Sequence, residues 1–179
     1  MKNIFFILLL ILSGTSVAHA DLYLELGAES GSQELVATSS GDNLYSGGGI
    51  KFAVGAQNYV SPYSSVRLTL GYLGDSVEAV NGHADMDTVT FDALYLVNSG
   101  PHSFGIGPTV HMNPTYRDSV AGYAPLKIEF DNAVGIMFQY GYQLLPGFEI
   151  GARLTSIEYS NNTTRLDAGS LGVYLSNGF

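Results

Sequence analysis

The 179-residue sequence contains no cysteine and no tryptophan, and it has few basic residues. The absence of cysteine excludes a disulfide framework, a cysteine-ligated zinc site and thiol catalysis. Seven lysines and arginines stand against 16 aspartates and glutamates, which argues against a nucleic-acid-binding protein, because such proteins present a basic face to phosphates. Glycine, with 22 residues, and tyrosine, with 12, are abundant, a bias that suits strands and tight bends better than helices.

The first twenty residues have the features of a secretory signal peptide. Lys2 provides a positive start, residues 4–12 are an unbroken apolar run, and Ala18-His19-Ala20 is a small-residue cleavage pattern. The run is too short for a membrane-spanning helix, which needs about 20 residues. We therefore predict a signal peptide over residues 1–20 and a mature domain over residues 21–179. Later apolar stretches are short and interrupted, so the mature chain is either a secreted soluble β-protein or a membrane β-barrel.

Eight successive segments alternate apolar residues with polar or small ones, a side-chain period that predicts strands. They cover residues 22–29, 46–54, 66–72, 88–97, 103–112, 126–142, 148–155 and 171–179. The polar phase mixes glycines with charges, as the narrow lumen of an eight-stranded outer-membrane barrel requires. The alternative is a soluble eight-stranded barrel that binds an apolar ligand, with the apolar phase turned inward.

The connections between these segments alternate in length. The links at 30–43, 74–86 and 113–124 are long, whereas those at 57–63, 98–101 and 143–147 are short. Outer-membrane barrels alternate long extracellular loops with short periplasmic turns, and an even number of strands leaves both termini in the periplasm. The sequence thus predicts an all-β fold: an eight-stranded antiparallel up-and-down transmembrane β-barrel in the outer membrane of a Gram-negative cell.

The C-terminal segment, residues 171–179, ends in Phe179 after alternating apolar residues. In this, and in its strand pattern along the whole mature chain, the sequence resembles the small bacterial outer-membrane barrels of the OmpA/OmpX type. The resemblance implies that the barrel assembly machinery reads Phe179 as an assembly signal. It also implies outer-membrane lipid and lipopolysaccharide as partners.

Charged residues in the inward phase are expected to form a paired network inside the lumen, because buried charges need counter-charges and hydrogen bonds. The predicted network consists of Glu25, Lys51, Arg67, Asp92, His111, Lys127, Glu129, Asp131, Glu149 and Arg153. The alternative function for these residues is a gated or selective pore. On the long connections carboxylates outnumber basic residues, which predicts either a solvated rim or a surface that binds divalent cations between lipopolysaccharide phosphates.

Few residues suggest catalysis. The four histidines, at 19, 83, 102 and 111, have no metal-ligand spacing, and we expect neither a metal nor a cofactor. However, residues 151–161 resemble the penultimate strand of the lipid A 3-O-deacylase family, which carries a His-x-Ser-Asn motif there. Ser160 and Asn161 fall on that motif, while Glu158 stands at the place of the histidine. A carboxylate is a poor base for activating a serine, so Ser160 and Glu158 are weak catalytic candidates and we expect no enzyme activity.

The sequence therefore predicts an integral outer-membrane barrel with a plugged polar lumen and a structural or surface-interacting role. A lipid A deacylase-like hydrolase and a small-molecule channel are the alternative functions.

Overall fold

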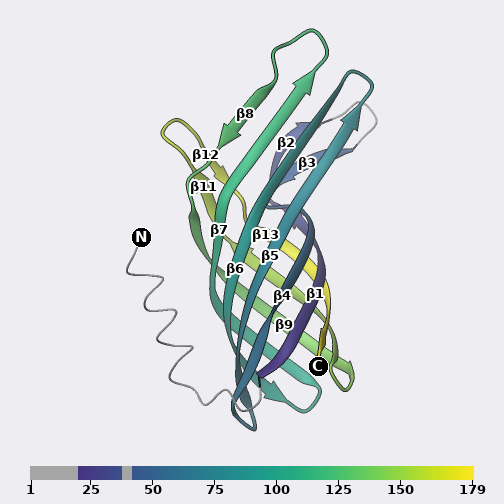
Figure 1. Ribbon diagram of the computed structural model, residues 1–179, viewed down its shortest axis with the longest axis vertical. Coiled ribbons are helices and arrows are strands. Elements are labelled where there is room, and N and C mark those ends of the chain that lie inside the picture. Colours follow the sequence, from purple (N-terminus) through teal and green to yellow (C-terminus); the bar gives the residue numbers. More distant parts are fainter. Residues whose placement is uncertain (1–19, 38–41) are drawn as a thin grey trace.

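The computed structural model describes residues 20–37 and 42–179, and eight of its strands form one closed antiparallel barrel (Figure 1). The predicted signal peptide falls, except for Ala20, outside the described residues. The barrel strands are β1 (Ala20–Gly31), β4 (Gly49–Ser61), β5 (Ser64–Ala79), β6 (Gly82–Ser99), β7 (His102–Val120), β9 (Ala133–Leu145), β10 (Phe148–Ser156) and β13 (Ser170–Gly178).

Each barrel strand pairs with the barrel strands that precede and follow it in the chain, and the first, β1, pairs with the last, β13. The strand order is β6-β5-β4-β1-β13-β10-β9-β7, and a further pairing of β6 with β7 joins the two edges. The predicted all-β, eight-stranded antiparallel fold is confirmed. Within the described ranges, no helix is long and apolar enough to cross a membrane.

One end of the barrel, which we call the turn end, is formed by three two-residue turns. Pro62-Tyr63 joins β4 to β5, Gly100-Pro101 joins β6 to β7, and Pro146-Gly147 joins β9 to β10. Gly100 and Gly147 have φ angles of 59° and 79°, a conformation that glycine adopts without steric cost. The C-terminus also lies at this end, where the backbones of Leu22 and Phe179 exchange two hydrogen bonds of 2.9 and 3.0 Å.

The opposite end, which we call the hairpin end, is built from strands where the sequence analysis expected loops. β5 and β6 continue as far as Ala79 and Gly82, and the upper part of β7 pairs with β8 (Leu126–Glu129). Two short hairpins complete this end, β2 (Gln33–Ala37) with β3 (Asn43–Ser46) and β11 (Glu158–Ser160) with β12 (Arg165–Asp167). Figure 1 shows these hairpins rising above the barrel wall.

A bulge on β7 reverses which side chains face inward. Asn113 has a φ of 50°, and its N–H donates a 2.9 Å hydrogen bond to the Asn132 side chain in the interval between β8 and β9. Below this level His111 faces the interior, whereas above it Tyr116 does. The segment 126–142, predicted as one strand, is therefore two strands with opposite phase.

Apolar side chains cover the outer wall, whereas polar ones fill the interior. The exposed large apolar residues of the wall are Leu22, Leu24, Leu26, Ile50, Phe52, Val54, Leu70, Tyr72, Val89, Tyr95, Val97, Phe104, Ile106, Val134, Ile136, Phe138, Tyr140, Tyr142, Ile150, Leu154, Leu171, Val173 and Leu175. A soluble barrel buries such residues, so the alternative with the apolar phase inward is wrong.

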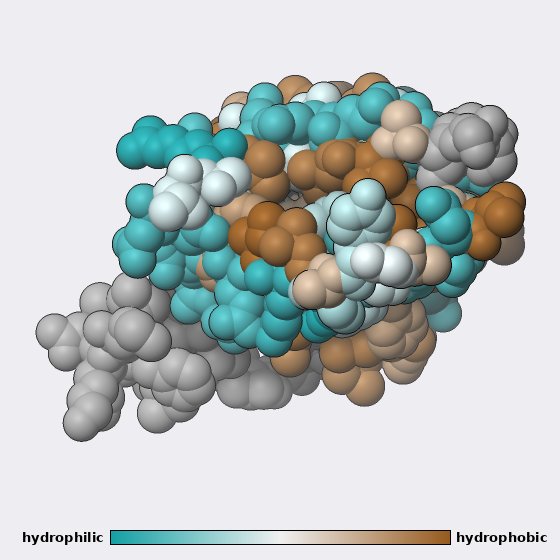
Figure 2. Space-filling view, turned by 90° about the horizontal axis from the view of Figure 1, so that it is seen from above, coloured by the Kyte–Doolittle hydropathy of each residue, from teal (hydrophilic) through white to brown (hydrophobic). Residues whose placement is uncertain are grey.

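Apart from a small cluster of Leu94, Leu96 and Met137 inside the barrel, the apolar core lies at the hairpin end. Its buried members include Leu44 from β3, Met86 from β6, Tyr116 from β7 and Tyr159 from β11, with Phe130 beside them. Figure 2, which looks down on this end, shows apolar residues in the middle and hydrophilic ones around them. This cluster, which we call the apolar cap, closes the interior above the polar lumen.

Candidate functional site

The interior near the turn end is organised around Arg67 of β5. Its guanidinium donates to Gln57 Oε1 at 2.8 Å and to the Tyr23 hydroxyl at 2.5 Å. It lies 3.4 Å from Glu149 Oε1 and stacks on the Tyr23 ring, 3.8 Å from its centroid. Glu149 also accepts hydrogen bonds from Ser103 at 2.6 Å and from Tyr174 at 2.9 Å. The pair is thus held by neutral side chains from four other strands.

The middle of the lumen holds a second ion pair, between Lys51 on β4 and Asp92 on β6. Lys51 Nζ is 2.7 Å from Asp92 Oδ2, and both side chains are 3% exposed. Thr69 and Thr109 donate to the two Asp92 oxygens at 3.1 and 2.6 Å. The carboxylate is therefore satisfied from three strands, as a buried charge requires.

A third group surrounds Arg153 of β10. Its Nη2 lies 2.5 Å from Glu25 Oε2, and its Nε lies 3.5 Å from Glu29 Oε1. Ser170 donates to the second oxygen of Glu29 at 3.1 Å. Arg153 is among the largest fully buried side chains, so its charge is compensated almost entirely by the two glutamates.

Not all predicted network residues enter these groups. His111 is buried but bonds to the Tyr159 hydroxyl at 2.5 Å in the apolar cap, apart from the ion pairs. Lys127 and Glu129 are exposed and pair with each other at 2.6 Å, and Asp131 is exposed as well. The reversed phase above Asn113 carries all three to the outer surface, so they do not belong to the lumen.

Several lumen residues were missed by the sequence analysis. Glu29 lies next to the first long connection and was not expected in the lumen, although it continues the inward phase of Glu25 and Gly27. Tyr23 and Tyr174 also lie in that phase, and their position was the available signal. Tyr159 continues the inward phase of Arg153 and Thr155, but it lies beyond residue 155, where the predicted strand ended.

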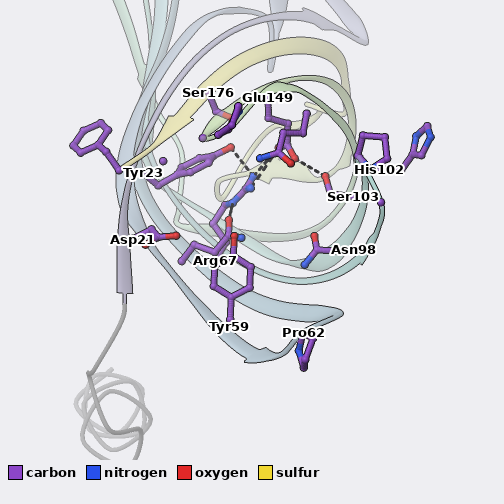
Figure 3. Close-up of a pocket in the computed structure, with 18 residues that line it drawn as sticks. Asp21, Tyr23, Tyr59, Pro62, Arg67, Asn98, His102, Ser103, Glu149 and Ser176 are labelled. Carbon is purple, nitrogen blue, oxygen red and sulfur yellow. Dashed lines mark hydrogen bonds and ion pairs between the residues drawn. The ribbon is translucent and has the colours of Figure 1, made fainter.

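The turn end opens into a cavity of about 560 Å³, which we call the vestibule (Figure 3). Its floor is the Arg67–Glu149 pair, and its wall includes Asp21, Asn98 and Ser176. Figure 3 shows Tyr23, Arg67, Ser103 and Glu149 converging on the floor. The vestibule is open at the turn end and ends on the Arg67–Glu149 pair, whose side chains are 4% and 13% exposed.

Glu158 and Ser160 lie on β11, with Tyr159 between them. Tyr159 points into the apolar cap, so its two neighbours face the opposite side of the strand. Glu158 pairs there with Arg165 at 3.7 Å, and both side chains are mostly exposed. His111 bonds to Tyr159 on the inner side, so it is not placed to take a proton from Ser160. In the described part of the chain, no three His, Asp or Glu side chains are grouped to hold a metal ion.

The outer face of the hairpin end carries paired charges. Arg117 lies 2.6 Å from Asp85 and 2.5 Å from Asp87, and these hydrogen bonds raise the pKa of the Arg117 guanidinium further above its usual value. The hydrogen bond from Lys127 lowers the pKa of Glu129. Each basic residue at this end is therefore matched by at least one carboxylate.

Comparison with known proteins shows similarity in fold alone. No protein-family model matches the sequence, and no curated protein matches it. Among solved structures, Ail, the attachment invasion locus protein of Yersinia pestis, is 11% identical with a TM-score of 0.58, over 89% of this chain and 96% of that chain.

Two further structures share the arrangement. Neisserial surface protein A (NspA) is 14% identical with a TM-score of 0.53, covering 89% of this chain and 97% of that chain. A major outer membrane protein from Thermus thermophilus is 12% identical with a TM-score of 0.51, covering 89% and 99% respectively. The chain therefore has the eight-stranded barrel fold found in bacterial outer-membrane proteins.

Proposed function

We propose that this protein is an integral outer-membrane β-barrel whose lumen is closed and whose role is structural or surface-interacting. The observation that carries the proposal is the reversed polarity of the barrel, with apolar side chains outside and ion pairs inside. Exposing so many apolar side chains to water is unfavourable, and a bilayer removes that cost. The fold shared with outer-membrane proteins supports the same location.

In the proposed orientation the turn end faces the periplasm and the hairpin end faces the exterior. Short turns and a C-terminus on one side, with long hairpins on the other, are typical of outer-membrane barrels. The barrel assembly machinery and lipopolysaccharide are the partners proposed with this location. Phe179, which directly follows β13 where that strand pairs with β1, is the proposed assembly signal.

The surface that this orientation presents to the exterior does not suit a polyanion. Ail has been solved in complex with the heparin analogue sucrose octasulfate. Here the basic residues of the hairpin end, Arg117, Lys127 and Arg165, are each paired with a carboxylate. Unpaired basic residues are what attract sulfates, so we do not extend heparin recognition to this chain.

The location is tested by membrane fractionation combined with gel mobility. The mature chain is expected in the outer-membrane fraction and to migrate differently with and without heating, because a closed barrel leaves no unpaired strand edge for detergent to attack. Recovery from the soluble periplasm would overturn the proposal. An epitope inserted between Val80 and Asn81, at the tip of the β5–β6 hairpin, is expected to be accessible on intact cells. The same epitope at Gly100 is expected to be inaccessible.

A further inference from the structure

The outer wall carries an open groove among side chains that the proposed function places against lipid. It crosses β6, β7, β9, β10 and β13 and encloses about 590 Å³. Two other grooves lie on the outer face. The one over β1 and β13 holds only about 220 Å³, and the one beside Ile50 and Phe52 holds about 560 Å³ but reaches the charged Asp85 and Asp87 at the hairpin end. The groove over β6 to β13 is open to the outside, so an extended apolar ligand would lie along it rather than be enclosed.

The strand register explains the shape of the groove. Gly105, Gln139 and Arg153 are neighbours across β7, β9 and β10, and their side chains, where present, turn inward. Their backbones form a floor between two rows of outward side chains. One row includes Phe104, Tyr140 and the small Ala152, and the other includes Ile106, Phe138 and Leu154.

The dimensions of the groove fit one acyl chain. Five strands spaced about 4.8 Å apart give it a length of roughly 19 Å. Strands in such barrels tilt by about 35–45°, so a line across them also rises along the barrel axis. One leaflet occupies half of a hydrocarbon core about 30 Å thick, which a tilted groove of this length matches.

The groove begins close to the turn end and rises away from it. Val97 and Phe104, at its β6–β7 end, lie two residues from the ends of their strands. Ala152 and Leu171, at the other end, are four or more residues from the turn-end limits of β10 and β13. In the proposed orientation, the groove therefore opens at the headgroups of the periplasmic leaflet, which consists of phospholipid.

A polar group stands beside this opening. His102 lies on the outer surface, and its Nδ1 is 2.9 Å from the hydroxyl of Tyr140, which lines the groove. Figure 3 shows His102 pointing away from the barrel interior. With the Tyr140 hydroxyl donating to Nδ1, the hydrogen of the neutral ring is on Nε2, where it is available to a phosphate oxygen.

The surroundings also indicate the headgroup charge. In the described part of the chain, every lysine and arginine lies either in the lumen or at the hairpin end, so none is available at the turn-end rim. An anionic headgroup would find no lysine or arginine beside His102. We propose that the groove binds one acyl chain of a zwitterionic phospholipid of the periplasmic leaflet, with its phosphate beside His102. This inference rests on the proposed outer-membrane location.

The test is native mass spectrometry of the purified mature chain, released from micelles containing phosphatidylethanolamine, phosphatidylglycerol or lipid A. The wild type is expected to retain one phosphatidylethanolamine in preference to the other two lipids.

Ala152→Phe fills the groove and is expected to lower the retained fraction by about tenfold, because the acyl chain loses its apolar contacts. Ala56→Phe, a matched change on the outer face of β4 away from the groove, is expected to retain the lipid. His102→Ala removes one hydrogen bond and is expected to lower retention by about fivefold.

Heat-dependent gel mobility, measured on the same samples, separates this inference from the proposed function. If the wild-type chain shows no heat-dependent gel mobility, the proposed outer-membrane barrel itself is contradicted. A folded wild type that prefers lipid A, retains no lipid, or forms a dimer that Ala152→Phe abolishes would overturn only the lipid site. Equal retention of phosphatidylethanolamine by Ala152→Phe and Ala56→Phe would also overturn the lipid site. The wild-type lipid preference stands as a test even where a variant does not fold.

Discussion

Residues inside the barrel are held by hydrogen bonds as much as by charge. Arg67, Asp92 and Glu149 each have at least two neutral partners besides an ion-pair partner. Burying an ion costs several kcal/mol, which one counter-charge does not repay without further hydrogen bonds. The tyrosines, threonines and glutamines of the lumen therefore stabilise the barrel by completing the solvation of the charges.

Removing one charge from such a group leaves the other buried and unpaired. Arg67→Ala strips Glu149 of its cation and leaves Gln57 and Tyr23 without their partner, so we expect a loss of about 3 kcal/mol in unfolding free energy. The value lies at the low end of the range for buried pairs because vestibule water reaches Glu149. Urea titration followed by circular dichroism and gel mobility measures the change. Arg165→Ala, which breaks an exposed pair, is the control and is expected to cost less than about 1 kcal/mol. Equal losses in the two variants would refute the buried network.

The position of Ser160 leads to a prediction about catalysis. Its strand neighbour Glu158 is paired with Arg165, and His111 lies on the other face of β11. Among the described residues, no histidine lies on the Ser160 face of β11, and a carboxylate is a poor base for activating a serine hydroxyl. Lipid A from cells expressing the wild type is expected to have the same mass spectrum as lipid A from cells expressing Ser160→Ala. Removal of an acyl chain by the wild type alone would show that Glu158 acts as the base.

At the scale of elements, the barrel strands were predictable and the hairpin end was not. The period of two extends through every barrel strand because each has one face toward the lumen and one toward the outside. At the hairpin end this contrast is reversed, since inward residues such as Met86 and Tyr116 are apolar and outward ones such as Asp85 and Arg117 are charged. Where the apolar residues pass from the outward to the inward phase, the period of two is interrupted, and such a segment resembles a loop in the sequence.

The bulge at Asn113 explains the misplaced charges. The alternation over residues 126–142 placed Lys127 and Glu129 in the lumen. This pattern carries no information about the left-handed conformation of Asn113 on the neighbouring strand. Glycine or asparagine is required for such a bulge, and asparagine alone is a weak signal. Apart from Glu29, the charges of the three ion-pair groups below the bulge were predicted to face inward, but which residues pair depends on the register between strands far apart in sequence.

The bulge gives a prediction at this scale. Asn113→Val places a β-branched residue at a φ of 50° and removes no core contact, so we expect a loss of about 1–2 kcal/mol in unfolding free energy. Asn113→Gly accepts the same φ and is expected to unfold close to the wild-type urea concentration. Unfolding midpoints of the two variants make the comparison. If glycine is as destabilising as valine, backbone strain is not what Asn113 relieves.

On the scale of the whole molecule, the interior holds side-chain groups at successive levels along its axis. The vestibule ends on Arg67 and Glu149, the middle is filled by the groups around Lys51 and Arg153, and the apolar cap covers the top. Glycines in the inward phase, such as Gly151 beside the Tyr174 ring, leave room for these large side chains. An interior of this kind stabilises the barrel, and in the proposed orientation the hairpin end is the surface that meets the exterior.

Closure at several levels predicts that the barrel does not conduct. Purified wild-type protein in planar bilayers is expected to give no steady single-channel current, because an ion would have to displace buried pairs whose separation costs several kcal/mol. The double variant Phe130→Ala and Tyr159→Ala opens the apolar cap but leaves the ion pairs in place, and it is expected to be silent as well. Steady currents from the wild type would favour the channel over the closed barrel. Currents from the double variant alone would show that the cap, rather than the charged interior, is the seal.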